Sequence, residues 1–330
     1  MKTLIPAAIA LAPITACLGW VYARWMLGHR IGQQIRELGP QGHAVKAGTP
    51  TMGGLLVLLT WGIAVAAHTS SAEWASPIGF VLAAAGLHGV LGLVDDVQSV
   101  RRRRSLGLSA PSKILLGTLA AVGLFFAFGD VLAVPQRIPF LSLELVLPPA
   151  ATFALVWIAL LATTNSMNLA DGIDGLAGGL AVLILVGLLV LTPSRTAFVL
   201  IVPLLGVLLG FLWLNTHPAQ LFLGDVGSFA LGAIVAAVAL ATGTAFYLPL
   251  VAGVLVLESG SVILQILSCR VLGTRLFKMS PLHHHFEQST TARSRHLLPG
   301  FEWPETAVAT RFWLLQALFV GLACWAAYGG

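Results

Sequence analysis

The sequence is poor in charged side chains. Lysine, arginine, aspartate and glutamate together make up 9% of the 330 residues, whereas 57% are hydrophobic. An ordinary soluble domain carries about 25% charged residues, so this composition excludes that class, and the apolar content excludes intrinsic disorder. The 35 glycines and 17 prolines follow no regular repeat, which excludes a collagen-like chain. The class that is left is a membrane protein with many spans.

Cysteine is also scarce. Cys17, Cys269 and Cys324 show no CxxC spacing and lie in or beside apolar runs, where a thiol behaves as a small hydrophobic group, so we predict no disulfide. The first apolar run lacks a small-residue cleavage site and is followed by many others, which predicts a retained helix. The net charge of +5 is expected to come from cytoplasmic loops, and no nucleic-acid partner is expected.

Apolar runs fill most of the chain. A span needs about 20 apolar residues, and fewer inside a bundle. We predict ten spans, with approximate limits 3–27, 52–68, 76–94, 112–129, 149–164, 174–192, 196–214, 226–243, 246–268 and 308–328. The prediction is therefore an all-α polytopic membrane protein of a single domain, residues 1–330, whose function lies at the membrane.

The basic residues orient these spans. With the N-terminus outside, all of the 18 lysines and arginines except Lys2, Arg137 and Arg195 fall on the cytoplasmic side. Because cytoplasmic loops are enriched in basic residues, this orientation is favoured, and both termini are expected to lie outside. Residues 134–147 partly alternate between apolar and polar side chains, which predicts a short β-hairpin on the outer surface.

Two adjacent carboxylates, Asp95 and Asp96, close the third predicted span. The C-terminus of a helix already carries partial negative charge, so the pair is unfavourable there unless a cation or a proton-transfer role compensates. The alternative is an interfacial pair solvated by water and by the arginines at 101–104.

Three more aspartates lie at the starts of later spans. Asp171 and Asp174 precede the sixth span in the run NLADGIDG, three residues apart and thus on one helix face if the helix starts early. The alternative is a polar turn in which Asp174 is the N-cap. Asp225 opens the eighth span in LGDVGS, where a helix N-terminus can bind an anion and the aspartate can also serve as its cap.

Three consecutive histidines, His283, His284 and His285, lie in the loop between the last two spans. They suit a phosphorylated substrate better than a metal, and the alternative is a solvated basic loop. Carboxylates without cysteine partners favour Mg²⁺, with Mn²⁺ possible. Because phosphoryl transfer depends on positioning and charge neutralisation, the residues predict Mg²⁺-dependent transfer of a phosphorylated group onto a lipid phosphate at the cytoplasmic face.

Several of these segments resemble one family closely. The matching residues are 39–40, 46–54, 95–96, 168–175, 222–228, 262–265, 281–287 and 311–313. They run in order over nearly the whole chain, and they resemble the phospho-N-acetylmuramoyl-pentapeptide-transferase (MraY) family, among the polyprenyl-phosphate N-acetylhexosamine-1-phosphate transferases. The resemblance implies that UDP-N-acetylmuramoyl-pentapeptide and undecaprenyl phosphate give lipid I and UMP, with Mg²⁺, in the bacterial cytoplasmic (inner) membrane. It further implies a homodimer and a ninth helix broken at 258–261.

The resemblance also implies the site residues. The metal ligands are Asp95, Asp96 and Asp225, and the catalytic residues are these three with His284. Phe222 is expected to stack on uracil. The full substrate-binding set is Lys46, Thr51, Asn165, Asn168, Asp171, Asp174, Asn215, Phe222, Gln265, His283 and His285.

Two departures and two rivals accompany the resemblance. The family's Asp-Asp-x-x-Lys motif has Ser99 in the lysine position, so the arginines at 101–104 or Lys113 are candidates to supply that charge. Residues 288–302 form a longer segment than is usual. The nearest rival function is transfer of N-acetylglucosamine-1-phosphate from UDP-GlcNAc to the same lipid. A cation-coupled transporter is the rival from another class, although its site would be expected near the bilayer midplane.

Overall fold

The computed structural model describes residues 3–29, 32, 48–102, 107–288 and 295–329. In this part of the chain, eight helices are long and apolar enough to cross a membrane. They are α1 (Leu4–Gly28), α3 (Pro77–Arg102), α4 (Ala110–Leu132), α5 (Pro149–Ala170), α7 (Arg195–Asn215), α8 (Gly224–Ala241), α10 (Gly253–Val271) and α12 (Glu305–Tyr328). Two shorter apolar helices, α2 (Gly53–Ala66) and α6 (Leu176–Leu191), occupy the second and sixth predicted spans. The all-α prediction is confirmed.

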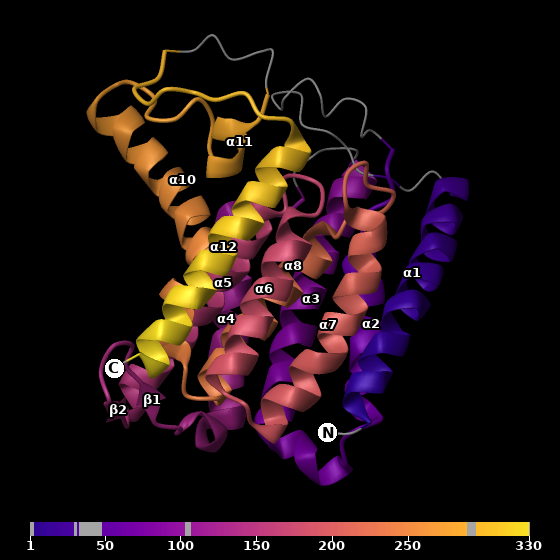
Figure 1. The fold of residues 1–330 in the computed structure, drawn as a ribbon, viewed down its shortest axis with the longest axis vertical. Helices are drawn as coiled ribbons and strands as arrows, with labels where there is room; N and C mark the ends of the chain where they lie inside the picture. The colour runs from indigo at the N-terminus through magenta and orange to yellow at the C-terminus, as the bar shows by residue number, and fades with distance from the viewer. Residues whose placement is uncertain (1–2, 30–31, 33–47, 103–106, 289–294, 330) are drawn as a thin grey trace.

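The helix α8 lies at the centre of the bundle (Figure 1). Every residue from 226 to 241 is buried, which is the pattern of a helix that is apolar on all sides and enclosed by other helices. Helices α3, α5 and α2 pack against it. Its N-terminus therefore lies inside a ring of helix ends, where side chains of other elements can reach it.

The third span differs from its prediction. Helix α3 continues through Asp95 and Asp96 to Arg102, so the two acids lie inside the helix and not at its end. Its last turn carries Arg101 and Arg102, which suit the partial negative charge of a helix C-terminus. The helix therefore ends at Arg102 and not at the predicted limit of 94.

The ninth span is broken, but not where the sequence predicted. The short helix α9 (Leu248–Val251) ends before α10 begins at Gly253, whereas the predicted interruption at 258–261 lies within continuous helix. Ser259 donates to the carbonyl of Leu255 at 2.9 Å, so its hydroxyl is used inside the helix. The break is instead spanned by buried Gln316 of α12.

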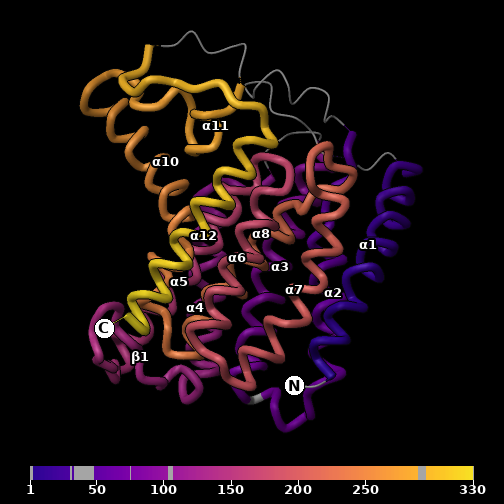
Figure 2. The backbone as a smooth tube through the Cα atoms, viewed as in Figure 1, coloured from indigo at the N-terminus to yellow at the C-terminus, as the bar shows by residue number. Residues whose placement is uncertain are grey.

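The Gln316 amide pairs with both sides of the break. Its Nε2 donates to the Val251 carbonyl at 2.6 Å, and its Oε1 accepts from the Val254 amide at 3.2 Å. A buried backbone group without a partner is costly, most of all inside a bilayer, so this side chain makes a change of helix direction tolerable. Beyond the break, α10 diverges from the bundle (Figure 2).

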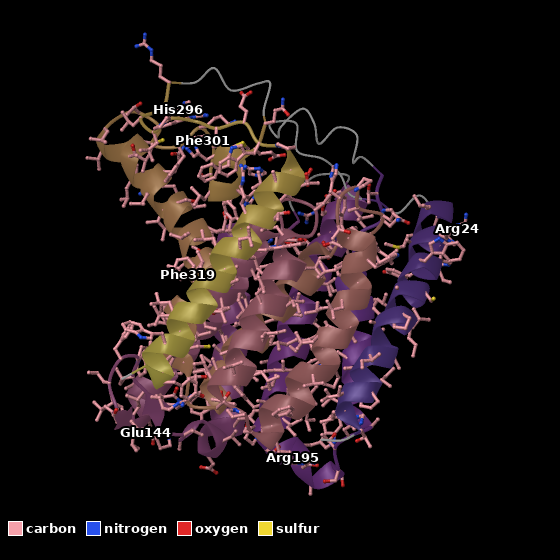
Figure 3. The ribbon with its side chains drawn as sticks, in the orientation of Figure 1. Arg24, Glu144, Arg195, His296, Phe301 and Phe319 are labelled. Carbon is pink, nitrogen blue, oxygen red and sulfur yellow. The ribbon has the colours of Figure 1, made fainter. Side chains whose placement is uncertain are left out.

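Both chain ends lie at one end of the bundle, together with a two-stranded hairpin (Figure 1). Strands β1 (Gln136–Arg137) and β2 (Glu144–Leu145) pair antiparallel, which confirms the predicted hairpin. The short helix α11 (Leu282–Phe286) lies at the opposite end. Figure 3 shows Glu144 and Arg195 at the hairpin end and His296 and Phe301 at the α11 end.

The remaining elements are two 3₁₀ turns. The first, η2 (Ser71–Ala75), precedes α3, and the second, η3 (Ala245–Tyr247), precedes α9. Arg195 at the start of α7 forms an ion pair with Glu73 of η2. These turns connect helices at the hairpin end of the bundle, away from the predicted site.

Candidate active site

Asp96 caps the N-terminus of α8 from a neighbouring helix. Its Oδ1 accepts from the Asp225 amide at 3.1 Å and its Oδ2 from the Val226 amide at 3.0 Å. The first amides of a helix have no partner inside it, and a carboxylate also suits the positive end of the helix dipole. The close approach needs Gly92, since a Cβ there would lie 2.2 Å from the Asp225 carbonyl oxygen.

Lys113 connects two of the three clustered aspartates. Its Nζ lies 2.7 Å from Oδ2 of Asp225 and 3.2 Å from Oδ2 of Asp95. The lysine lies one turn into α4, where a positive charge opposes the helix dipole. The sequence analysis named Lys113 and the arginines at 101–104 as candidates for the charge missing at Ser99. Lys113 is in the cluster, Arg101 and Arg102 are exposed, and residues 103 and 104 lie outside the described residues.

Asn168 holds the other oxygen of Asp225. Its Nδ2 lies 2.8 Å from Asp225 Oδ1 and 3.0 Å from the Ser228 hydroxyl. Both oxygens of Asp225 therefore have fixed donors, one from α4 and one from α5. The sequence analysis placed Asn168 among the substrate ligands, and here it orients the aspartate.

The distances decide which predicted metal ligands face one point. Oδ2 of Asp95 and Oδ2 of Asp225 are both within 3.2 Å of the Lys113 nitrogen, whereas both oxygens of Asp96 face backbone amides of α8. Carboxylate oxygens are the ligands that Mg²⁺ prefers. Asp95 and Asp225 therefore fit as direct ligands of a divalent ion, and Asp96 fits as the residue that fixes the position of Asp225.

A second polar group surrounds Asp174. Its Oδ2 accepts from the Ala219 amide at 3.1 Å and lies 3.0 Å from Nδ1 of His217, while its own amide donates to Glu305 at 2.6 Å. Gly175, not Asp174, is the N-cap of α6, so the capping alternative is wrong. Among the described residues, Asp174, His217 and Glu305 have ligand atoms within 4.8 Å of one another.

His217 and Glu305 were missed by the sequence analysis. Glu305 follows a proline at the start of α12, where an acid is ordinary because it suits the helix dipole. His217 precedes a proline in a short loop. Neither position carries a signal that separates it from a structural role. The five aspartates thus divide: three gather at the start of α8, Asp174 belongs to the second group, and Asp171 is the C-cap of α5.

The segment that begins α2 pairs with the segment that begins α8. The Gly53 amide donates to the Phe222 carbonyl, and the Phe222 amide donates to the Pro50 carbonyl, each at 2.8 Å. Thr51 is buried and Phe222 is half-buried beside this ladder. The pairing brings two predicted nucleotide-pocket residues next to Asp225. Lys46 lies outside the described residues.

Three predicted substrate amides are occupied by the protein backbone. Asn215 donates to the Leu221 carbonyl at 3.0 Å, and Asn165 donates to the Leu161 carbonyl of its own helix at 2.8 Å. Gln265 accepts from the amides of Leu276 and Phe277 and donates to the Phe277 carbonyl. Their substrate contacts stay predictions, and so does a role for Asp171, the C-cap of α5.

The histidine run is folded into the protein, so the alternative of a solvated loop is wrong. Nδ1 of His283 lies 3.1 Å from buried Glu258, Nδ1 of His284 lies 2.8 Å from Glu287, and Nδ1 of His285 accepts from the Lys278 amide. Burial lowers the pKa of the His285 imidazole, and the neighbouring His296 and Lys278 act in the same direction. Because Nδ1 of His285 accepts the Lys278 amide hydrogen, that nitrogen carries no proton of its own.

The long segment after the histidines packs back onto α11 and α12. The Trp303 amide donates to the Phe286 carbonyl at 2.8 Å, and the two rings stack with centroids 4.8 Å apart. The Arg311 guanidinium lies 3.9 Å from the centroid of the Trp303 ring. Phe301, which lies within 288–302, also stacks on Phe286 with ring centroids 5.7 Å apart, so the described part of this segment contributes to the aromatic cover of the histidine helix.

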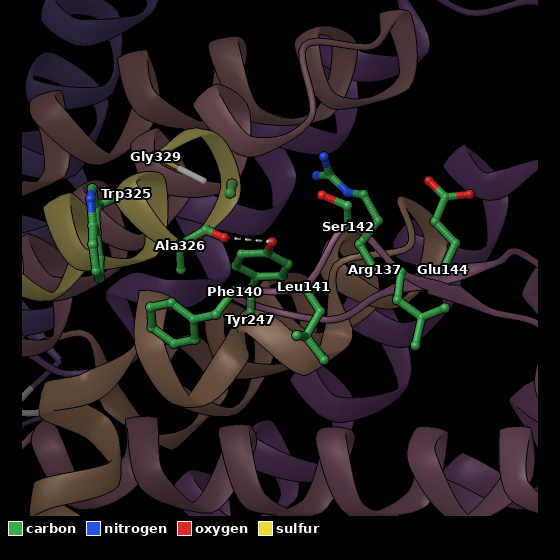
Figure 4. Close-up of a pocket in the computed structure, with 11 residues that line it drawn as sticks. Arg137, Phe140, Leu141, Ser142, Glu144, Tyr247, Trp325, Ala326 and Gly329 are labelled. Atoms are coloured by element: carbon green, nitrogen blue, oxygen red, sulfur yellow. Dashed lines mark hydrogen bonds between the residues drawn. The ribbon is translucent and has the colours of Figure 1, made fainter.

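A cavity of about 540 Å³ lies at the hairpin end, away from the aspartates (Figure 4). Arg137, Phe140, Tyr247 and Trp325 help line it, and the Tyr247 hydroxyl donates to the Ala326 carbonyl at 3.5 Å. No predicted site residue lines it. The aspartate cluster therefore remains the candidate site.

Known proteins resemble the chain over nearly its full length. The model for glycosyl transferase family 4 matches residues 78–243, and the phospho-N-acetylmuramoyl-pentapeptide-transferase signature 1 matches residues 46–58. The transferase of Rubrobacter xylanophilus is 38% identical, covering 97% of this chain and 96% of its own length. That of Moorella thermoacetica is 41% identical, covering 98% and 96%, and that of Bacillus pumilus is 36% identical, covering 94% and 95%. The chain belongs to the phospho-N-acetylmuramoyl-pentapeptide-transferase family.

Proposed function

We propose that the protein transfers phospho-N-acetylmuramoyl-pentapeptide from its UDP carrier to undecaprenyl phosphate at the cytoplasmic face of the bacterial inner membrane. The products are lipid I and UMP, so the enzyme serves peptidoglycan synthesis. Family membership gives the reaction. The observation that carries its location is the cluster in which Lys113 lies between Asp95 and Asp225.

The reaction joins two phosphates. An oxygen of undecaprenyl phosphate attacks the phosphorus attached to the sugar, and the bond from that phosphorus to the UMP oxygen breaks. Charge develops on the leaving phosphate, and preorganised positive groups stabilise it in the transition state. Lys113 is the cation placed for this purpose, held by the carboxylates of Asp95 and Asp225.

A bound Mg²⁺, or Mn²⁺, would neutralise the pyrophosphate and hold it beside the lipid phosphate. Asp95 and Asp225 are the residues proposed to bind the ion, because their Oδ2 atoms lie close enough to share one cation, a place that the Lys113 ammonium takes in this structure. Asp96 and Asn168 orient Asp225 from opposite sides. With both oxygens of Asp225 held, its geometry is fixed before substrate arrives.

The nucleotide is proposed to bind beside the cluster. Phe222, half-buried next to the start of α8, offers a ring face to uracil, and Thr51 lies in the strand-like segment paired with it. Asp171 and Asp174 lie in the turn between α5 and α6. Asn168, which contacts Asp225, is in the last turn of α5 just before them. This arrangement supports a pocket that runs from Asp225 toward the turn.

The membrane topology is part of the proposal. Ten apolar helices, with α9 and α10 together as the ninth span, would cross the bilayer with both termini outside and the aspartates inside. The two chain ends lie at the same end of the bundle in Figure 1, as this topology requires. A homodimer is proposed from the family resemblance.

One assay tests the function. Purified full-length protein in lipid nanodiscs is incubated with Mg²⁺ and UDP-N-acetylmuramoyl-pentapeptide, with and without undecaprenyl phosphate, and UMP release is measured. UMP should appear only with both substrates and should disappear on chelation. Release from UDP-GlcNAc in place of the muramoyl substrate would support the rival transferase.

A further inference from the structure

A carboxylate and an imidazole are buried together between α10 and α11. Glu258 and His283 are both 0% exposed, and Oε2 of the acid lies 3.1 Å from Nδ1 of the ring. Within the part of the chain that the structure describes, Glu258 Oε1 and His283 Nε2 have no hydrogen-bond partner. Two unsatisfied atoms in a fully buried pair call for an explanation other than stability, because apolar side chains would fill the same space at lower cost.

The free edge of the histidine ring faces the turn that joins α5 to α6. A Cβ added to Gly172 would lie 2.4 Å from His283 Nε2. Gly172 has an ordinary backbone conformation, so the glycine is required by space and not by strain. The ring is therefore held between Glu258 on one side and Gly172 on the other.

The same turn carries two residues of the proposed nucleotide pocket. Asp171 directly precedes Gly172, and Asp174 follows two positions later and is fixed by His217 and Ala219. A shift of the His283 ring would move Gly172 and with it the Asp171 side of the turn. Glu258 contacts His283 from α10, and the His283 ring in turn faces Gly172, so the acid is linked to this turn through the ring.

We propose that Glu258 is a positioning residue for the transfer reaction. Its carboxylate accepts the Nδ1–H of His283, which fixes the ring so that its Nε2 edge supports the pocket turn at Gly172. The unpaired Nε2 lone pair is then directed at the turn. This inference rests on the proposed function, because it assigns the turn to the nucleotide substrate.

The first test is a series of substitutions at 258. Glu258→Gln keeps the shape of the side chain but loses its charge, and we expect the KM for UDP-N-acetylmuramoyl-pentapeptide to rise about 10-fold, the lower end of the effect that loss of an orienting carboxylate has on metal-binding histidines. The KM for undecaprenyl phosphate should not change. Glu258→Asp keeps the charge, so its KM for UDP-N-acetylmuramoyl-pentapeptide should lie between the values for the wild type and for Glu258→Gln. A purely structural role would lower kcat through the active fraction and leave both KM values unchanged, and that result overturns the proposal.

The second test approaches the ring from the other side. Gly172→Ala should displace His283 and raise the same KM, and the double variant Gly172→Ala with Glu258→Gln should be no worse than the more severe single variant. Effects of residues that act through one ring are not additive. If the two changes multiply, or if Gly172→Ala keeps the wild-type KM, the proposal fails even where Glu258→Gln does not fold.

Two controls separate the possible failures. Glu302→Gln makes the same chemical change at an exposed position near α12, and it should leave both KM values as in the wild type. Wild-type protein must release UMP under the same conditions. Absence of UMP from the wild type would refute the proposed function, whereas wild-type activity with unchanged Glu258 variants would refute only the role of Glu258.

Discussion

The two ends of the helix bundle treat charge differently. At the α11 end, Asp95 and Asp96 of helix α3 are both buried. Asp95 pairs with Lys113, and Asp96 accepts backbone amides of α8. At the hairpin end, Glu73 pairs with Arg195, whose side chain is 63% exposed. Exposed pairs contribute little to stability, whereas buried charges are costly and need fixed partners. The comparison supports the proposal that the buried charges at the α11 end take part in the reaction.

The largest effect is expected at Asp225. Asp225→Asn keeps the size of the side chain but removes the charge that pairs with Lys113, and we expect UMP release to fall by at least about 10²–10³-fold, as when one charge-stabilising group is lost. Initial rates of UMP release at saturating substrate measure it. A rate within a few-fold of wild type would contradict the contrast between the two ends, because the charge of Asp225 would then not be needed for the reaction.

The second largest loss of activity is expected when the positive charge of Lys113 is removed. Lys113→Met should lower the rate by about 10²-fold, since the carboxylates of Asp95 and Asp225 lose their shared partner. Lys113→Arg should not restore it, because a planar guanidinium does not place one nitrogen between two oxygens as an ammonium does. Full rescue by arginine would show that only net charge matters at this end.

The aromatic side chain of the proposed pocket should have a smaller effect. Phe222→Ala should weaken UMP binding by about 1–3 kcal/mol if the ring stacks on uracil as aromatic residues do on bases. Isothermal titration calorimetry on protein in nanodiscs would measure this. Phe126→Ala, at an 80% exposed position on α4, is the matched control and should bind UMP normally. Equal affinities for the two variants would remove Phe222 from the pocket.

An uncharged buried group in the middle of the bundle should affect stability and not chemistry. Gln316→Leu leaves the Val251 carbonyl and the Val254 amide unpaired, so we expect a loss of about 1–3 kcal/mol in unfolding free energy. Thermal unfolding in detergent would show a lower midpoint. An unchanged midpoint would mean that the break at Ala252 finds other partners.

The smallest effect is expected at the hairpin end. The hydrogen bond from Arg195 holds the pKa of Glu73 at about 2, and the Ser70 amide acts in the same direction. The folded pKa is below the ordinary value, so the contribution is present above about pH 4.5 and is lost as the pH falls toward 2. Because the Arg195 side chain is 63% exposed, the ion pair is screened by solvent and contributes little. Glu73→Gln should therefore not measurably change the unfolding midpoint at pH 7, and a clear drop would contradict the contrast between the two ends.

The helices were predictable because they depend on local composition. Ten apolar runs gave helices close to the expected limits, and the alternation in 134–147 gave the hairpin. The break at Ala252 was not predictable, because the groups that it frees are satisfied by Gln316 of another helix. The polar residues at 258–261 misled the prediction, since serine hydroxyls can bond within their own helix.

The site was predictable only in part. Acids at the ends of apolar runs are unfavourable alone, so Asp95, Asp96 and Asp225 were visible in the sequence. Their arrangement was not, because it depends on contacts between helices: Asp96 with the amides of α8, and Lys113 across two aspartates. His217 and Glu305 occupy positions where such residues are common, so no local signal marked them.

The cap that Asp96 provides changes how its substitution must be interpreted. An inactive Asp96→Ala enzyme would also have lost the side-chain oxygens that accept from the Asp225 and Val226 amides at the start of α8, a helix buried from 226 to 241. Loss of turnover there would report on the architecture of the whole bundle as much as on the reaction. Asp96→Asn keeps one carbonyl oxygen at the same place. A comparison of the two variants therefore separates loss of the helix cap from loss of the carboxylate charge.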